Sequence, residues 1–280
     1  EISECLVGSE MCIRDSLIAL IDNIYPGTKI YNLDIVKNNH EGKSTYINCD
    51  VRSEINIDIP VTSEDVIFNF AAVHRTPGHP DQAYFETNIR GAENVCAFAE
   101  KFGIKKIVFT SSIAPYGAAE DLKTEETLPT PNTPYGISKL VAEKIHTIWQ
   151  AKKSNERQLT IVRPGVVFGK GENGNFTRLY WGIRGGKFFY PGRKDTIKAC
   201  IYVKELVRFM LYRLENHNEG VELYNCTYEP AFTIEQIVET MKKATGLQRT
   251  VVEVPGSLLM TVARIVGCLL YTSPSPRDTR

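Results

Sequence analysis

One pair of segments constrains the possible folds of this 280-residue chain more than any other feature: a predicted buried strand, and the start of a helix that comes later in the sequence. The apolar run Ile107–Phe109 leads into Thr110-Ser111-Ser112 and predicts a strand with Ser112 at its carboxyl end, where parallel α/β sheets bind ligands. The later segment Thr133–Lys139 begins with a good helix-capping residue, followed by a proline at the first helical position, where its missing N–H costs no hydrogen bond. We expect the strand-end hydroxyl and the helix start to meet at one edge of a sheet.

Within that helix, Tyr135 and Lys139 are four residues apart, so their side chains lie on one face, one turn apart. A free tyrosine has a pKa near ~10, and a neighbouring ammonium group favours the phenolate and lowers that pKa. A phenol tuned in this way can take a proton from an alcohol and return it at neutral pH. The spacing alone is a weak signal, because tyrosine and lysine also occur together on solvated helices. The interpretation therefore depends on the surrounding elements.

Strands and helices alternate along the chain. Strands are predicted at residues 29–34, 44–49, 65–70, 107–112, 159–162 and 221–226. The helix that continues from Tyr135 is expected to bury an apolar face made of Leu140, Val141, Ile145, Ile148 and Trp149. Alternation of this kind predicts an α/β fold with a Rossmann-like, doubly wound parallel sheet.

The chain divides in sequence after the last of these motifs. A loop rich in glycine, lysine and asparagine at residues 170–175 marks the boundary. Residues 17–169 are expected to form an NAD-binding Rossmann-like domain, to which the strand at 221–226 returns. Residues 170–267 are expected to form mainly a smaller substrate-binding lobe, in which Thr233–Gln236 has the pattern of a capping box.

The combination of Ser112, Tyr135 and Lys139 with these motifs resembles the extended short-chain dehydrogenase/reductases, in the NAD-dependent epimerase/dehydratase group. The resemblance runs from about residue 17 to residue 267. It implies that Tyr135, as a phenolate, removes a hydroxyl proton while hydride passes from a sugar carbon to NAD. It also implies that Lys139 lowers the tyrosine pKa and bonds the nicotinamide ribose, while Ser112 hydrogen-bonds the reacting oxygen.

Further residues are predicted to contact NAD. Asp34 ends the predicted strand at 29–34, which corresponds to the second strand of a dinucleotide-binding fold. An acidic residue at that place accepts hydrogen bonds from the adenosine ribose and repels a 2′-phosphate. The resemblance implies other contacts, which are Asp50 and Val51 beside the adenine, Phe70, Ala71 and Ala72 along the cofactor, Asn88 in support of the lysine, and Pro164 and Gly165 at the nicotinamide.

The substrate side departs from the family pattern in two positions. Val166 stands where relatives carry an asparagine that contacts the substrate, and Lys198 stands where many carry an arginine that contacts the sugar-nucleotide diphosphate. A lysine acts as a point charge and not as a bidentate fork, so its contact would be less directional. A solvated surface lysine is the alternative reading of Lys198.

Both ends of the chain are expected to be foreign to the fold. Leu6–Ser16 can be encoded by a DNA whose reverse complement, in another frame, encodes Leu269–Arg277. We therefore interpret residues 1–16 and 268–280 as translated sequencing-adapter sequence and exclude them from fold prediction. The family's first strand and its G-x-x-G-x-x-G turn, which holds the pyrophosphate, are expected to be missing. A chain without that turn should bind NAD poorly or not at all and should be inactive.

Composition limits the partners. The 33 basic and 33 acidic residues balance, so nothing indicates a nucleic-acid or membrane surface. Outside the ends, the four cysteines at 49, 96, 200 and 226 are widely spaced, which favours buried thiols in a reducing compartment over metal ligands or disulfides. We expect no metal, a cytoplasmic location, a nucleotide-sugar substrate and, among assembly states, a homodimer.

The preferred function is an NAD-dependent, nucleotide-sugar 4-epimerase-like oxidoreductase. A sugar 4,6-dehydratase is disfavoured, because such relatives carry an Asp-Glu pair after the strand-end hydroxyl and this chain has Ile113 and Ala114. A net reductase or dehydrogenase stays open and would consume NAD(H) stoichiometrically. Two other readings are a non-catalytic NAD-sensing or scaffold protein of the same fold and an inert fragment of such an enzyme.

Overall fold

The computed structural model describes residues 4–7, 11–37, 43–74, 79–118, 121–172, 174–218 and 220–258. The chain forms two compact units. The first comprises Glu1–Glu172 and Ala199–Glu229, and the second comprises Asn173–Lys198 and Pro230–Arg280. The second unit is smaller than residues 170–267, because residues 199–229 return to the first.

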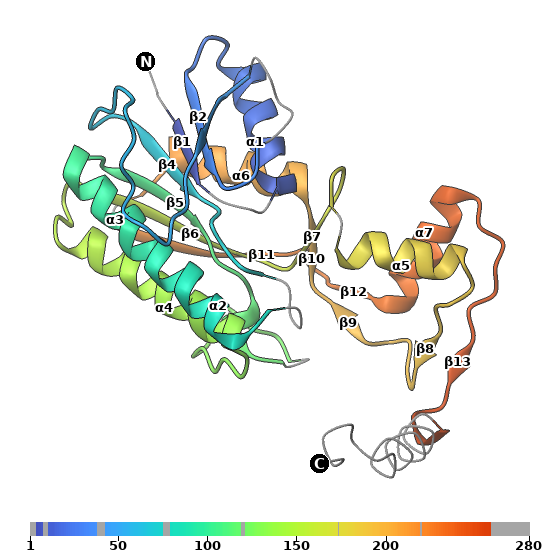
Figure 1. Cartoon of the computed structure of the whole chain (residues 1–280). Helices are drawn as coiled ribbons and strands as arrows, with labels where there is room; N and C mark the ends of the chain where they lie inside the picture. The colour runs from blue at the N-terminus through green and yellow to red at the C-terminus, as the bar shows by residue number, and fades with distance from the viewer. Residues whose placement is uncertain are drawn as a thin grey trace, which may run out of the picture. The chain divides into compact units, whose positions relative to one another are not determined.

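The first unit is built on a seven-stranded sheet in which every neighbouring pair is parallel (Figure 1). Its strands, in spatial order, are β11 (Val221–Cys226), β6 (Gln158–Pro164), β5 (Lys106–Thr110), β4 (Val66–Asn69), β1 (Glu4–Val7), β2 (Ile30–Asp34) and β3 (Thr45–Asn48). The order reverses between β1 and β4, and in doubly wound sheets ligands bind outside the carboxyl ends of the strands at such a point. The predicted fold class is confirmed.

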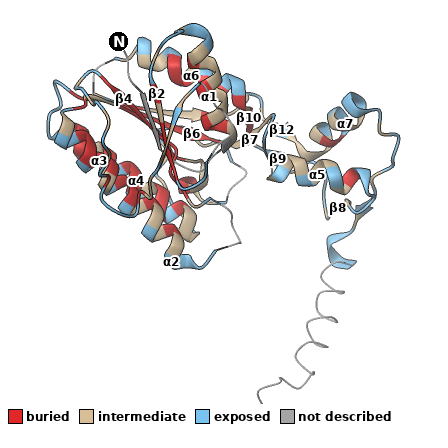
Figure 2. Ribbon diagram, turned by 45° about the horizontal axis from the view of Figure 1, so that its top comes forward, coloured by how far each residue is buried: buried red, intermediate tan, exposed pale blue. Residues whose placement is uncertain are grey.

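Helices cover both faces of this sheet. Helices α1 (Met11–Ile24) and α6 (Val203–Glu215) pack together on one face, and α3 (Arg90–Phe102) and α4 (Pro134–Ala151) pack together on the other. Side chains alternate between the two faces along each strand, so Ile107 and Phe109 join the core under α3 and α4 while Val108 joins the core under α1 and α6. Figure 2 shows this buried material as red bands along the strands and the inner helix faces.

The amino end differs from the expectation. Glu4–Val7 forms strand β1 between β2 and β4, and α1 begins at Met11, six residues before Leu17. Two neighbouring strands offer unpaired backbone groups at that position, and a short extended segment can pair with them whatever its side chains. The glycine-rich turn was predicted to be missing. Residues 8–10, which connect β1 to α1, lie outside the described residues, so that prediction is not tested. The adapter origin of residues 1–16 and 268–280 stays a prediction.

The buried face of α4 is not the apolar stripe that we expected. Ile148 is 59% exposed and Val141 is 36% exposed, although Trp149 is buried. The buried face instead carries several polar residues, which are Ser138, Lys139, Glu143, His146 and Gln150. The expectation is wrong for Val141 and Ile148, whereas Leu140 and Ile145 are half-buried. Polar side chains with partners in the fold occupy part of the face that packs on the sheet.

Shorter elements complete the first unit. Helix α2 (Asp81–Tyr84) runs into a π-helical turn at Phe85–Ile89, and a 3₁₀ turn at Ala114–Tyr116 follows β5. Strand β7 (Val166–Phe168) continues from β6 and pairs in parallel with β10 (Cys200–Tyr202). None of the helices in the described part of the chain is both long and apolar enough to cross a membrane.

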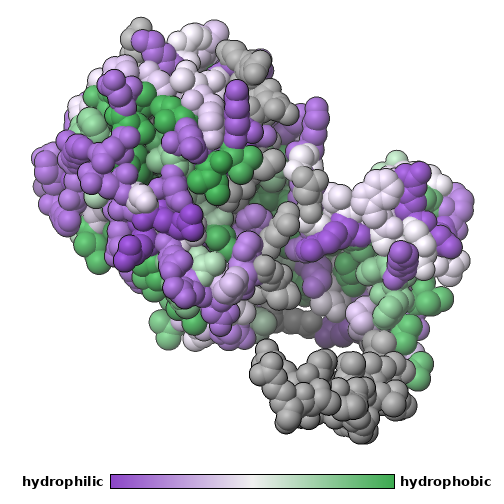
Figure 3. All heavy atoms as spheres, viewed as in Figure 1, coloured by the Kyte–Doolittle hydropathy of each residue, from purple (hydrophilic) through white to green (hydrophobic). Residues whose placement is uncertain are grey.

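The second unit has two helices and two small strand pairs. Its elements are α5 (Asn175–Arg184), β8 (Tyr190–Pro191) with β13 (Glu253–Val254), β9 (Ile197–Lys198) with β12 (Phe232–Thr233), and α7 (Ile234–Thr245). Ile183, Tyr190 and Val238 form its core. The predicted capping box at the start of α7 is confirmed, with Thr233 and Gln236 bonding each other's backbone groups. Hydrophilic and hydrophobic residues are mixed over the face seen in Figure 3.

Candidate active site

The predicted site residues of the first unit follow the carboxyl ends of its strands. Asp34 is the last residue of β2, Phe70 follows β4, Ser112 lies two residues after β5, and Pro164 ends β6. Parallel strands present their carboxyl ends at the same edge of a sheet, so these positions share one edge of the fold.

The start of α4 is held against the loop that carries Ser112. Thr133 caps the helix, its Oγ1 accepting from the Gly136 N–H at 3.1 Å, which confirms the predicted N-cap. A Cβ atom at Gly136 would lie 2.6 Å from the carbonyl oxygen of Ala114. Only glycine therefore allows this close approach, which brings the first turn of α4 onto the segment just after Ser112.

Lys139 is fully buried one turn below Tyr135. Its Nζ donates to the carbonyl oxygen of Thr110 at 2.8 Å and lies 5.1 Å from the centroid of the Phe109 ring. The Tyr135 ring lies 6.2 Å from the Tyr84 ring, centroid to centroid. The helix thus carries Tyr135 and Lys139 on one face, and the Lys139 ammonium group is fixed to the end of β5.

The hydroxyl of Ser112 lies in the turn after β5. Its Oγ accepts a hydrogen bond of 3.2 Å from the Ala114 N–H, which orients the side chain within that turn. A hydroxyl oxygen that accepts from a backbone amide still has a proton to donate.

Asn88 links the loop after β4 to the first turn of α4. Its Oδ1 accepts from the Val73 N–H at 2.8 Å, and its Nδ2 donates to Ser138 Oγ at 2.8 Å. The Ser138 hydroxyl in turn donates to the Tyr135 carbonyl at 2.8 Å. Asn88 therefore holds the backbone that carries Tyr135. Its predicted role beside the lysine and the cofactor stays a prediction.

Asp34, the residue predicted to bind the adenosine ribose, already has hydrogen-bond partners within the chain. Asp34 is buried, its Oδ2 pairs with Nη1 of Arg14, and its Oδ1 accepts from the Val36 N–H at 3.0 Å. Burial raises the pKa of Asp34, although the Val36 amide and the Arg14 guanidinium oppose that shift. We did not anticipate Arg14, because it lies in the segment that we had set aside from fold prediction.

The other predicted cofactor residues fall into two groups. Asp50 accepts from the Arg52 backbone N–H at 3.0 Å, and the hydrogen bond from the Arg52 side chain holds the pKa of Asp50 below its usual range. Val51, Phe70, Ala71 and Ala72 are all buried. The contacts of these residues with the cofactor stay predictions.

The predicted nicotinamide and substrate positions follow β6. The Pro164 carbonyl accepts from the Ile113 N–H at 3.1 Å, and a Cβ atom at Gly165 would lie 2.6 Å from the Ala199 carbonyl oxygen. The Val166 N–H donates to that same oxygen at 2.9 Å. Lys198 is exposed in β9 of the second unit, opposite Phe232, and its substrate contact stays a prediction.

Two buried polar groups on α4 were not predicted. Glu143 receives a bidentate pair from Arg163 of β6, with Nε–Oε1 and Nη2–Oε2 distances of 2.8 and 2.6 Å. His146 accepts from Asn69 Nδ2 at its Nε2, at 3.2 Å, and donates from Nδ1 to the Ala142 carbonyl at 2.7 Å. The only signal in the sequence was polar side chains at helical spacing from Lys139.

The cysteines at 49, 96, 200 and 226 are free thiols. Cys96, Cys200 and Cys226 are buried and Cys49 is half-buried. Burial raises the pKa of Cys96 and of Cys226 to about 12. Among the residues that the structure describes, no three His, Cys, Asp or Glu side chains gather as metal ligands would.

Comparisons with known proteins agree with this architecture. The undecaprenol-linked sugar epimerase of Escherichia coli O157:H7, named N-acetyl-alpha-D-glucosaminyl-diphospho-ditrans,octacis-undecaprenol 4-epimerase, is 35% identical over 225 residues, covering 80% of this chain and 68% of that protein. The structure of UDP-N-acetylglucosamine 4-epimerase from Bacillus cereus matches with a TM-score of 0.73 at 20% identity, over 90% of this chain and 85% of that one. UDP-glucuronic acid 4-epimerase from the same species, in complex with NAD, matches with a TM-score of 0.74 at 18% identity, over 91% of this chain and 88% of that one.

The family assignment comes from the sequence, since structural likeness at such low identity shows the fold alone. The profile of the NAD dependent epimerase/dehydratase family matches residues 19–227, which contain every predicted site residue. This chain belongs to the NAD-dependent epimerase/dehydratase family.

Proposed function

We propose that this protein is an NAD-dependent 4-epimerase of a diphosphate-linked sugar, with a nucleotide sugar as the first substrate to test. The observation that carries the proposal is the buried Lys139, fixed to the end of β5 one helical turn below Tyr135. The close approach of Gly136 to Ala114, which brings the helix start onto the Ser112 turn, supports it further.

The residues of this chain fit the nicotinamide half of NAD better than the adenosine half. On the nicotinamide side, Lys139 offers a buried cation, while the close approach at Gly165 is taken up by the Ala199 carbonyl of the chain itself. On the adenosine side, the Asp34 carboxylate is paired with Arg14, and residues 8–10 contain one glycine where relatives have three within the turn. NAD, when bound, supplies reversible hydride acceptance from the sugar carbon.

The proton chemistry falls to three side chains. Tyr135, as a phenolate, takes the proton of the sugar hydroxyl and becomes neutral. Lys139 stabilises the phenolate by its charge, and Ser112 donates a hydrogen bond to the reacting oxygen. After the resulting ketone turns over, Tyr135 returns its proton to the oxygen, so the sugar leaves with the carbinol inverted and no net redox change.

Other reactions of the family are less well supported. Dehydration needs an extra acid and base after Ser112, and Ile113 and Ala114 supply neither. Net reduction or oxidation uses the same three residues and differs in its cofactor balance. A sensing or scaffold protein would have no need of a buried ammonium beneath a phenol.

A lipid-linked sugar is the second candidate substrate. It is favoured by the E. coli O157:H7 relative, which is named for an undecaprenol diphosphate substrate and is 35% identical to this chain. Nucleotide and polyprenol substrates share the sugar diphosphate, for which Lys198 is the proposed cationic contact.

The assay that tests the proposal compares three substrates with NAD present. They are UDP-N-acetylglucosamine, UDP-glucose and a polyprenol-diphosphate N-acetylglucosamine, and the products are resolved by chromatography and NMR. The proposal expects interconversion of 4-epimers without net change in NADH absorbance. Stoichiometric NADH formation or loss would instead identify a dehydrogenase or reductase, and a dehydrated keto-sugar would identify a dehydratase.

A homodimer is part of the proposal. Ile137, Val141 and Ile148 leave an exposed apolar strip along α4, at 40%, 36% and 59% exposure. A second copy of α4 could bury such a strip. Sedimentation of the wild type and of Val141→Asp tests this, and a monomer for both would refute it.

A further inference from the structure

The buried ion pair between Glu143 and Arg163 connects the elements that carry the three reacting side chains. Glu143 lies on α4 one turn after Lys139 and two turns after Tyr135. Arg163 lies next to the end of β6. The side chains of the pair are only 4% and 3% exposed, respectively, so solvent does not screen them.

The Glu143 carboxylate is also hydrogen-bonded by a hydroxyl group from the segment directly after β5. Ser111 Oγ donates to Glu143 Oε1 at 2.5 Å, and Ser111 directly precedes Ser112. Glu143 therefore receives hydrogen bonds from two neighbouring strands at once. A bidentate guanidinium–carboxylate contact fixes orientation as well as distance.

The guanidinium of Arg163 also contacts the turn that follows Ser112. Its Cζ lies 4.7 Å from the centroid of the Tyr116 ring, four residues after Ser112. The Tyr116 hydroxyl donates to Asn225 Oδ1 at 2.9 Å, at the end of β11. Arg163 is therefore held between the helix that carries Tyr135 and the turn that carries Ser112.

We propose that Glu143 and Arg163 are positioning residues that set the distance between Ser112 and the Tyr135–Lys139 pair. The inference rests on the proposed function of those three residues. Neither Glu143 nor Arg163 takes part in proton transfer. Their ion pair orients α4 against β5 and β6, and a displacement of about 1 Å at reacting groups can cost a hundredfold in rate.

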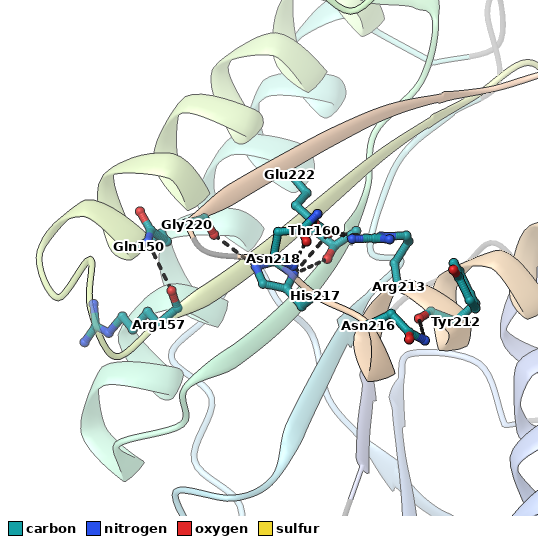
Figure 4. Close-up of polar contacts among 10 residues, drawn as sticks. All are labelled: Gln150, Arg157, Thr160, Tyr212, Arg213, Asn216, His217, Asn218, Gly220 and Glu222. Carbon is teal, nitrogen blue, oxygen red and sulfur yellow. Dashed lines mark hydrogen bonds and ion pairs between the residues drawn. The ribbon is translucent and has the colours of Figure 1, made fainter.

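Charge-conserving variants test position without changing the local charge. Arg163→Lys keeps the cation but loses the fork, and Glu143→Asp keeps the carboxylate but shortens its reach. A matched control lies on the opposite face of the sheet from α4, near the amino end of β11, where Arg213 of α6 donates from two nitrogens to the Glu222 carboxylate. The Arg213 guanidinium also lies 5.3 Å from the centroid of the Tyr224 ring. Figure 4 shows Arg213 and Glu222 among their neighbours.

Two readouts are measured on the full chain. The first is kcat and KM of epimerisation, where Arg163→Lys and Glu143→Asp should lower kcat about tenfold to a hundredfold with little change in KM. The second readout needs no turnover. It is the pH at which half of the Tyr135 phenol is ionised, measured as the difference in ultraviolet absorbance between each protein and its Tyr135→Phe counterpart. That midpoint should move toward the value found in Lys139→Met, while Arg213→Lys should change neither readout.

The outcomes separate the two proposals. A wild type that shows no turnover even at a saturating NAD concentration refutes the proposed function. The phenol titration needs neither NAD nor substrate and still decides the positioning role. Wild-type kcat and midpoint in both folded variants would overturn the inference, and so would an equal loss in Arg213→Lys. If Arg163→Lys does not fold, Ser111→Ala, which removes one hydrogen bond from Glu143, should move both readouts in the same direction by a smaller amount, and no movement would overturn it.

Discussion

The ammonium nitrogen of Lys139 donates a hydrogen bond of 2.8 Å to the carbonyl oxygen of Thr110, the last residue of β5. The side chain is fully buried, and its nitrogen lies 5.1 Å from the centroid of the Phe109 ring. Helix α4 and the strand that precedes Ser112 are thereby joined through the cation that, in the proposed mechanism, stabilises the phenolate.

Replacing Lys139 with Met should lower turnover while the fold persists. Methionine retains the length of the side chain but removes the charge that stabilises the phenolate, and general acid–base catalysis contributes about 10²–10⁴-fold in rate. Steady-state kinetics should find a loss of kcat in that range. Lys144→Met, on the exposed face of the same helix, is the control and should keep wild-type kcat. Equal activity in both variants would exclude a role for the buried ammonium.

Replacing Gly136 with Ala should destabilise the protein and reduce turnover together. The new methyl group would lie 2.6 Å from the Ala114 carbonyl oxygen, so helix α4 must shift away from the Ser112 turn. Such overpacking costs about 1–3 kcal/mol, measured as the free energy of unfolding in denaturant. Gly182→Ala in α5, where the nearest atom lies at 3.4 Å, should be neutral or stabilising. Wild-type stability and rate in Gly136→Ala would contradict the close approach.

His146 should make the protein lose stability in mild acid. Burial lowers its pKa to about 4, and the Ala142 carbonyl can only accept, so the neutral ring donates from Nδ1 and accepts at Nε2 from Asn69. Between pH 6.5 and 4 the unfolded chain binds one proton more than the folded chain at this residue. The free energy of unfolding should therefore fall as the pH falls, by about 3 kcal/mol from this group.

The variant His146→Asn tests that slope by denaturant unfolding across the same pH range. Its pH dependence should be shallower than that of the wild type, although the variant is less stable at neutral pH. His79→Asn, at an exposed residue, should retain the full wild-type slope. An unchanged slope in His146→Asn would show that other groups account for the acid sensitivity.

The chain of this sequence should bind NAD weakly. Asp34 is already paired with Arg14, and the segment between β1 and α1 has one glycine. Arg14→Gln removes the competing cation and should tighten NAD binding about tenfold, equivalent to ~1.4 kcal/mol, in a calorimetric titration at pH 7. Micromolar affinity in the unaltered chain, or no change on substitution, would refute this explanation.

Local patterns predicted much of the fold and part of the site. The N-cap at Thr133, the proline after it and the i, i+4 spacing of Tyr135 and Lys139 are short-range features, and the structure contains each of them. Strand-end positions such as Ser112 followed from the alternation of strands and helices, because parallel strands share one carboxyl edge.

Contacts between distant segments could not be read from those patterns. Arg163 and Glu143 are twenty residues apart and meet only because β6 packs under α4. Their burial also explains why the apolar periodicity of α4 was misleading, since a paired charge can occupy a core position that hydrophobic patterning assigns to Ile148. Strand β1 was missed because backbone pairing between β2 and β4 depends on the sheet and hardly on the side chains of residues 4–7.

The most direct test of the central claim is the replacement of Tyr135 with Phe, assayed for turnover and NAD affinity in the same preparation. Phenylalanine retains the ring beside Tyr84 but has no hydroxyl to exchange a proton with the sugar. Turnover should fall by at least about 10²-fold while the Kd for NAD changes little, because the phenol acts on the substrate proton. Near-wild-type turnover in Tyr135→Phe would contradict the account.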